Sequence, residues 1–103
     1  MSDNRRIQNR HDVSLPGKLT INGTTSDCTV VNLSLGGALV AAHTKYPMGQ
    51  RLHIAFSVPA PLHAIEVGGT VRWSNTDEVG VQFDGLRARD VWALSEFFKQ
   101  LAH

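Results

Sequence analysis

The sequence has few of the features that mark a secreted, membrane-spanning or disulfide-bonded protein. Cys28 is its one cysteine, which excludes an internal disulfide and a zinc site built from several cysteines. No apolar run approaches the length needed to cross a bilayer. Residues 1–12 include basic side chains but no apolar stretch behind them, unlike a secretory signal. We therefore expect a cytoplasmic protein with no membrane insertion.

The sequence also lacks an excess of charge of either sign. Ten Lys and Arg stand against nine Asp and Glu, which gives a formal net charge of +1 at pH 7. No overall basic field therefore attracts nucleic acid. Aromatic residues make up only 7% of the chain, whereas a barrel that binds single strands needs several exposed aromatics along a basic groove. We expect no DNA or RNA partner, and any anion site must be local.

Clusters of catalytic or metal-binding residues are missing as well. The five histidines are scattered without HxH or HxxxH spacing. His53 and His63 fall on neighbouring predicted strands, but two imidazoles without a carboxylate make a poor metal site. Ser34 has no Gly-x-Ser-x-Gly context, and Cys28 is predicted to be a small buried hydrophobe with no neighbour that lowers its pKa. We expect no metal, no cofactor and no enzymatic activity.

What the sequence does contain is a series of short segments in which apolar and polar residues alternate. The predicted strands cover residues 13–21, 28–33, 37–42, 52–58, 65–73 and 79–83. Gly68-Gly69 predicts a bulge or bend in the fifth strand. Because closure removes exposed strand edges, six short strands before one helix predict an all-β fold, a six-stranded antiparallel β-barrel with a C-terminal α-helix. The barrel domain would cover residues 13–103, after an arm of residues 1–12.

The apolar period becomes helical after Arg87. The predicted core stripe of this helix is Val91, Leu94, Phe98 and Leu101. Asp90 falls in the first turn, where the helix dipole favours an acid. Trp92 and Phe97 lie off the stripe, so this part of the helix is a candidate surface for a partner protein.

Two features stand apart from this predicted core. The first is the polar arm of residues 1–12, in which Arg5, Arg6 and Arg10 gather three guanidiniums. The second is NLSLGG, residues 32–37, a polar and glycine-containing interruption between two apolar segments. Each has an ordinary explanation: a solvated tail, and a turn in which Asn and Ser bond to backbone amides while Gly takes a positive φ.

Taken together, the two features supply the groups that bind a guanine nucleotide. An arginine fork binds phosphate oxygens or the O6 and N7 atoms of guanine in a bidentate manner. An Asn oxygen and a Ser hydroxyl can accept hydrogen bonds from the N1–H and N2–H groups of guanine. A Gly pair lets a ligand approach the backbone closely and adds free N–H groups.

These residues give the sequence a resemblance to the PilZ domain family, receptors for the bacterial second messenger cyclic di-GMP. The family motifs RxxxR and (D/N)xSxxG match Arg6-Ile7-Gln8-Asn9-Arg10 and Asn32-Leu33-Ser34-Leu35-Gly36-Gly37. The motifs occur in the family order, one predicted strand apart. Two further family-like segments, GTVRW at residues 69–73 and VGVQF at 79–83, extend the resemblance over nearly the whole chain.

The resemblance implies a ligand, cyclic di-GMP, and a set of residues that bind it. The implied set is Arg5, Arg6, Arg10, Asn32, Ser34, Gly36, Gly37 and Trp73. Arg6 and Arg10 would contact guanine edges and phosphates, with Arg5 assisting or stacking on a base. Asn32 and Ser34 would contact a guanine from the barrel surface, and the two glycines would shape the turn.

Two of these assignments stay open at the level of sequence. Trp73 would either lie beside a bound base or fill the core, since it continues the inward alternation of Val71. Arg72 is expected on the opposite face, where it could still add positive charge near the ligand. Asn32 replaces the Asp that is more common in the motif, which removes a carboxylate and a negative charge and could change the affinity in either direction.

The expected function is that of a stand-alone cyclic di-GMP receptor. The arm would be mobile without ligand and would fold over the nucleotide, bound singly or as an intercalated dimer, to signal to a downstream protein. The first alternative is an adaptor that keeps the fold for protein interaction and binds nucleotide weakly or not at all. The second is an oligonucleotide-binding barrel.

Overall fold

Six strands and one helix make up the described part of the chain, residues 10–42 and 45–101 of a computed structural model. In chain order they are β1 (His11–Ile21), β2 (Thr24–Leu33), β3 (Gly37–Ala41), β4 (Arg51–Pro59), β5 (Leu62–Ser74), β6 (Glu78–Phe83) and α2 (Ala88–Leu101). The prediction of six strands and a C-terminal helix is therefore confirmed. β1 begins at His11, two residues before the predicted boundary between arm and barrel domain.

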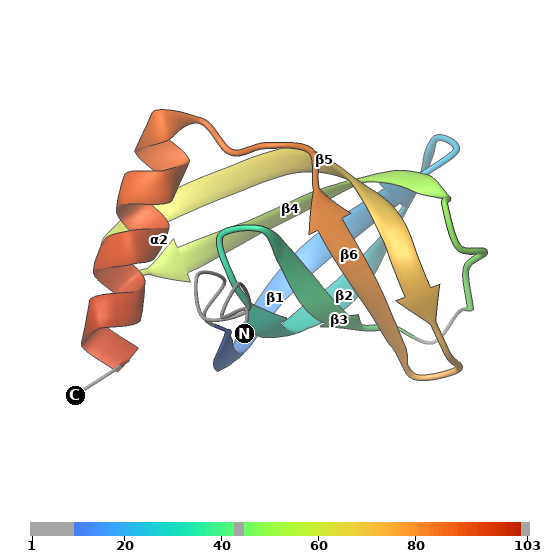
Figure 1. Ribbon diagram of the computed structural model, residues 1–103, viewed down its shortest axis with the longest axis horizontal. Helices are drawn as coiled ribbons and strands as arrows, with labels where there is room; N and C mark the ends of the chain where they lie inside the picture. The colour runs from blue at the N-terminus through green and yellow to red at the C-terminus, as the bar shows by residue number, and fades with distance from the viewer. Residues whose placement is uncertain (1–9, 43–44, 102–103) are drawn as a thin grey trace, which may run out of the picture.

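The six strands close into an antiparallel barrel with the order β1-β2-β3-β6-β5-β4 (Figure 1). β1 pairs with β2, β2 with β3, β4 with β5 and β5 with β6. The pairs β3–β6 and β1–β4 close the barrel. In Figure 1, α2 stands across one end of the barrel, where it contacts β4 and β5. The other strands leave an outer surface that the helix does not cover.

The barrel interior follows the alternation of the sequence most clearly in β4. Leu52, Ile54, Phe56 and Val58 are all buried there, as predicted. Each such side chain stabilises the fold by about 1.5–3 kcal/mol through its removal from water. Cys28 belongs to the same core, and burial raises the pKa of its thiol to about 11. The thiol is therefore protonated at neutral pH and packs as a small hydrophobe.

Two irregularities in strand pairing turn polar and aromatic side chains to the outside of the barrel. The register of β2 against β3 shifts between Val30 and Asn32, and that of β5 against β6 shifts between Val71 and Trp73. A bulge places one extra residue in a strand and changes which side chains point outward after it. Of the predicted bulge or bend at Gly68-Gly69, the bulge is wrong, because the pairing of β4 with β5 runs through these residues without a shift.

The buried face of α2 differs from the predicted stripe. The residues of this helix that are buried are Asp90, Ala93, Leu94 and Phe97. Of the predicted stripe, Leu94 is buried and Phe98 packs partly buried against the core, whereas Val91 and Leu101 are 36% and 42% exposed. Phe97 was expected to lie off the core stripe and is buried, while Trp92 is 58% exposed.

The rotation of α2 has a polar cause at its first turn. The carboxylate of Asp90 is only 1% exposed, and its Oδ1 atom lies 2.8 Å from Nε2 of His63 in β5. Nε of Arg87 lies 3.6 Å from Oδ2 of the same carboxylate. A buried carboxylate needs such partners, so the pair with His63 fixes which side of the helix faces the barrel. At the other side, the ring of Phe98 stacks on His11 at 4.0 Å.

The Asp90 pair predicts a specific acid dependence of stability. Burial opposes ionisation of Asp90, but the side-chain hydrogen bond with His63, a hydrogen bond with the backbone of Arg87 and the positive charge of the Arg87 guanidinium outweigh it and lower the pKa of the carboxyl below its ordinary value. A carboxyl with a lowered pKa contributes stability above its unfolded-state pKa of about 4, and this contribution is lost as the pH falls through the folded-state value. Asp90→Asn is expected to cost about 2 kcal/mol at pH 7, with the difference from wild type shrinking below about pH 4.

Urea unfolding of wild type and Asp90→Asn between pH 3 and pH 7 measures this difference. Glu96→Gln, which removes from the same helix a partly exposed carboxylate paired with Lys99 at the surface, is the matched control and is expected to leave the pH dependence nearly unchanged. A difference between wild type and Asp90→Asn that stays constant across this pH range would contradict the assignment.

Candidate functional site

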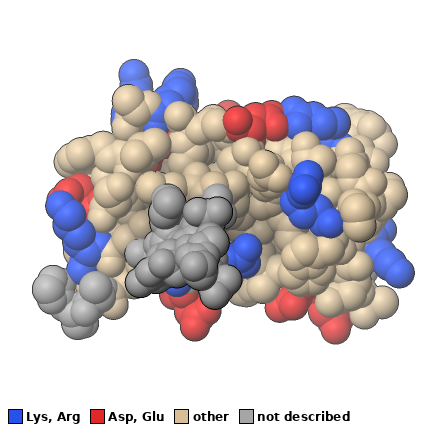
Figure 2. Space-filling model, in the orientation of Figure 1, with Lys and Arg blue, Asp and Glu red and all other residues tan. Residues whose placement is uncertain are grey.

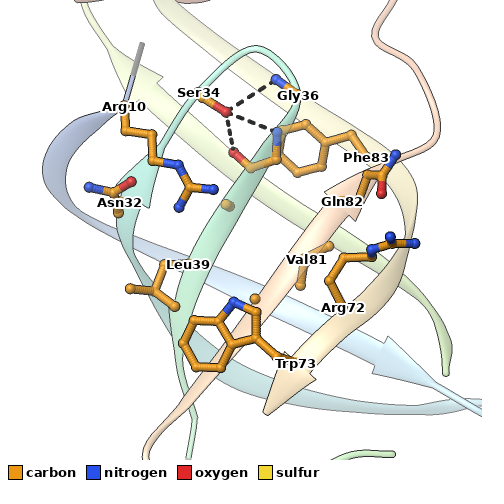
Figure 3. A pocket seen from close by; sticks show the side chains of 13 residues that line it. Arg10, Asn32, Ser34, Gly36, Leu39, Arg72, Trp73, Val81, Gln82 and Phe83 are labelled. Carbon is orange, nitrogen blue, oxygen red and sulfur yellow. Dashed lines mark hydrogen bonds between the residues drawn. The ribbon is translucent and has the colours of Figure 1, made fainter. Parts of the chain in front are cut away.

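The two bulges bring outward-facing side chains into one row across four strands. Asn32 of β2 pairs with Leu39 of β3, Leu39 pairs with Gly80 of β6, and Gly80 pairs with Trp73 of β5. This row crosses a hollow of about 370 Å³ on the outer face of the barrel, within the usual size range of small-molecule sites. The hollow is lined by Arg10, Asn32, Ser34, Gly36, Gly37, Ala38, Leu39, Arg72, Trp73, Gly80, Val81, Gln82 and Phe83 (Figure 3).

The floor of the hollow contains an exposed aromatic ring. Trp73 is 42% exposed, so the interpretation of this residue as core filling is wrong. A Cβ atom at Gly80 would overlap the indole, which means that glycine at this position allows Trp73 to lie directly on β6. An exposed indole held flat on a sheet offers a π-face on which a nucleic-acid base can stack.

Two guanidiniums flank the hollow. Arg10, just before β1, and Arg72, at the bulge of β5, are both exposed and lie on opposite sides of it in Figure 3. Arg72 was predicted to point away from the face of Trp73, which is wrong because the bulge turns both side chains outward. Elsewhere the visible surface mixes basic and acidic side chains (Figure 2). The positive charge at the hollow is therefore a local feature that suits an anion.

Ser34 organises the turn that borders the hollow. Its Oγ accepts hydrogen bonds from the N–H groups of Gly36 at 3.2 Å and Gly37 at 3.1 Å, and donates to the carbonyl of Gly37 at 3.3 Å. Its backbone N–H also donates to that carbonyl, at 2.9 Å. A hydroxyl has one donor and two acceptor positions, so these bonds occupy all three. The direct contact of Ser34 with a guanine stays a prediction.

The two glycines of the turn act differently from the expectation. Their N–H groups were predicted to be free for a ligand, which is wrong because both donate to Ser34. Neither glycine has a positive φ. Gly37 is required for another reason, since a Cβ there would collide with the carbonyl oxygen of Val81 in β6.

Asn32 has a partner that the sequence did not indicate. Its Nδ2 donates to Oδ1 of Asp12 at 2.9 Å, and the two residues face each other across the β1–β2 pair. Asn32 lies at the edge of the hollow and is partly exposed. The amide can therefore contact both Asp12 and a molecule in the hollow.

Six of the predicted ligand-binding residues line the same hollow. They are Arg10, Asn32, Ser34, Gly36, Gly37 and Trp73. Arg5 and Arg6 lie outside the described residues. The sequence reasoning missed Leu39, Gly80 and Gln82, which contribute from β3 and β6. The signal for them was the alternation of these two strands, whose outward positions must face the same side as Asn32 once the strands pair.

The described residues hold neither a metal centre nor a membrane-spanning helix. Residues 10–42 and 45–101 contain no group of three His, Cys, Asp or Glu side chains arranged to hold a metal ion. In that part of the chain, no helix is long and apolar enough to span a membrane.

The hollow combines an indole floor, flanking guanidiniums and an amide at its edge. These groups on a closed barrel define a small β-barrel domain suited to binding a base and a phosphate. The chain belongs to the PilZ domain family, whose family model matches residues 4–100. None of the curated proteins compared with the chain matches it significantly.

Solved structures with this fold include three bacterial proteins. The inhibitor of motility MotI/DgrA of Bacillus subtilis is 18% identical with a TM-score of 0.79, and the match covers 90% of this chain and 49% of that one. PlzA of Borreliella burgdorferi, crystallised in complex with cyclic di-GMP, is 23% identical with a TM-score of 0.64 and coverage of 92% and 41%. The PilZ domain of CeSA from a cellulose-synthesizing bacterium is 13% identical with a TM-score of 0.69 and coverage of 92% and 99%. The chain thus spans about half or less of the length of MotI and PlzA, and these similarities show the shared fold.

Proposed function

We propose that this domain is a receptor for cyclic di-GMP rather than an enzyme, and that it binds the nucleotide in the hollow on the barrel surface. The observation that carries the proposal is the convergence of Arg10, Asn32 and Trp73 on one hollow, although they come from the start of β1, from β2 and from β5. Membership of the PilZ family and the complex of PlzA with cyclic di-GMP support it.

Each group in the hollow has a role that fits this ligand. Trp73 provides a face for stacking of a guanine base. Arg10, together with Arg6 of the RxxxR motif, binds phosphate oxygens or the O6 and N7 edge of guanine, and Arg5 and Arg72 add positive charge. The Asn32 oxygen accepts from guanine N–H groups. Ser34, Gly36 and Gly37 contribute by holding the turn beside the base.

The receptor would act in the bacterial cytoplasm by passing the binding event to a downstream protein. Arg10 is followed directly by His11, whose ring stacks on Phe98 of α2 at 4.0 Å. Ligand contact with Arg10 is therefore one residue away from a contact with the helix. The outer side of α2 carries Trp92, which is 58% exposed and is available for contact with another protein.

Calorimetric titration with cyclic di-GMP tests the proposal. We expect a dissociation constant on the order of 1 μM, which corresponds to a binding free energy of about −8 kcal/mol. Arg10→Ala and Arg6→Ala are each expected to weaken binding about tenfold or more, since a charge-assisted hydrogen bond contributes about 1.5–3 kcal/mol. Arg89→Ala removes the same charge from α2, where the residue is exposed and does not line the hollow. It is the matched control and is expected to bind as wild type does.

The results separate this proposal from its main alternative. Binding that survives both Arg6→Ala and Arg10→Ala undiminished, or that falls equally in Arg89→Ala, would contradict the assigned roles. The alternative is a PilZ-fold adaptor for protein interaction, and the exposed Trp92 favours it. Absence of nucleotide binding, together with a protein partner retained equally with and without nucleotide, would support the adaptor.

A further inference from the structure

The Asp12–Asn32 pair controls which atom of the Asn32 amide faces the hollow. Nδ2 of Asn32 donates to Oδ1 of Asp12 at 2.9 Å, the one hydrogen bond that this side chain makes among the described residues. The two positions are direct cross-strand neighbours, so the bond is held by the sheet itself. An amide presents two donors on one side and an acceptor on the other, and fixing one side fixes the other.

The chemistry of the partner determines the direction of the amide. An ionised carboxylate can only accept hydrogen bonds, so the NH₂ group of Asn32 must be the one that faces Asp12. The amide oxygen then points the other way. Figure 3 shows this oxygen on the side of Arg10, toward the hollow, with the amide nitrogen turned away.

We propose that Asp12 is a positioning residue that sets the base specificity of the hollow. By holding the NH₂ group of Asn32, it presents an acceptor, and only an acceptor, to the bound base. Guanine offers two adjacent donors to this acceptor, N1–H and N2–H, whereas adenine offers a single donor group, N6–H₂, beside an acceptor at N1 that the amide oxygen repels. This inference rests on the proposed binding of cyclic di-GMP in the hollow, and it explains how an Asn can serve where a carboxylate is more common.

The negative charge of Asp12 has a second and opposite effect. It lies near the site of a dianionic ligand, so its removal reduces repulsion of the phosphates while it releases the amide. Total affinity combines both effects. The ratio of affinities for cyclic di-GMP and cyclic di-AMP separates them, because the two ligands carry the same phosphates and differ in their bases.

The experiment is a set of titrations with both nucleotides in two backgrounds. With Asn32 present, Asp12→Ala is expected to lower the cyclic di-GMP to cyclic di-AMP ratio about tenfold, because the freed amide can turn its NH₂ group toward adenine N1. The isosteric Asp12→Asn is expected to lower the ratio less, because its own amide oxygen can still accept from Asn32. In the Asn32→Asp background both faces of the side chain accept. There Asp12→Ala is expected to leave the ratio unchanged within about twofold and to raise the affinity for cyclic di-GMP, since two facing carboxylates repel.

The outcomes distinguish this inference from the proposed function. If the wild type binds cyclic di-GMP and the ratio stays the same in Asp12→Ala, the role of Asp12 is overturned and the receptor assignment stands. If the wild type does not bind cyclic di-GMP at all, the proposed function fails. Thermal unfolding of each variant without ligand checks the fold. Should Asp12→Ala be unstable, Asp12→Val decides the matter, because valine favours a strand and has no hydrogen-bonding group. An equal fall of the ratio in both backgrounds would indicate a structural role and would also overturn the inference.

Discussion

Gly37→Ala is expected to destabilise the barrel by about 3 kcal/mol, the upper end of the usual cost of overpacking. The added Cβ would collide with the backbone carbonyl oxygen of Val81. A backbone atom in a paired strand cannot rotate away as a side chain can, so β3 and β6 would have to separate. These strands carry Leu39 and Gly80 in the middle of the hollow, and ligand binding is expected to fall with stability.

The sign of this effect is informative because Gly→Ala changes at compatible positions usually stabilise a protein, by about 0.4–1 kcal/mol. Gly23→Ala is the comparison variant, in which the backbone conformation is unfavourable but no clash occurs: Gly23 has φ of 83° and no atom within 4 Å of an added Cβ. Backbone strain alone is expected to cost about 1 kcal/mol there. Equilibrium urea unfolding measures both variants. A Gly37→Ala protein as stable as wild type would show that β3 and β6 tolerate wider spacing.

Gly80→Ala is expected to weaken binding of cyclic di-GMP about tenfold while changing stability little. Its Cβ would overlap the indole of Trp73, and this indole is exposed and able to rotate away from β6. The stacking face would then leave the floor of the hollow. Base stacking on an aromatic side chain contributes about 1–3 kcal/mol, which sets the size of the expected loss.

A double-mutant cycle identifies Trp73 as the cause. In the Trp73→Ala background the added methyl group meets no indole, so Gly80→Ala is expected to have no further effect on affinity. Trp73 fluorescence, read in a Trp92→Phe background that leaves one tryptophan, is expected to change on ligand binding in wild-type Gly80 protein and much less in Gly80→Ala. If Gly80→Ala lowers the affinity for cyclic di-GMP equally with and without Trp73, the proposed role of the indole is contradicted.

Local alternation was sufficient to predict the strands but not the faces that follow a bulge. In β4 every second residue is buried from Leu52 to Val58, and the pattern in the sequence has the same period. In β5 the alternation of Val67 and Val71 continues in the sequence to Trp73, yet the register shift after Val71 turns Trp73 outward. A bulge depends on the partner strand, so a pattern within one strand does not reveal it.

The helix and the site show the same limit for contacts distant in sequence. The sequence predicts Asp90 only as an acid in the first turn of a helix. Its partner His63 is 27 residues away in the sequence, and this pair determines which side of α2 is buried. Asp12 and Asn32 are 20 residues apart and meet only through the register of β1 and β2. The two motifs nevertheless predicted that Arg10, Asn32 and the turn at Ser34 lie at one surface, and the structure brings these residues to the same hollow.

The circular pairing of the six strands has a consequence for recognition by other proteins. Around the hollow, β2, β3, β6 and β5 are paired side by side, so this face offers no open backbone edge to which an incoming peptide could add as a further strand. A protein that binds this face must therefore recognise side chains. Specificity for such a partner would lie in residues that can change one at a time while the backbone stays the same.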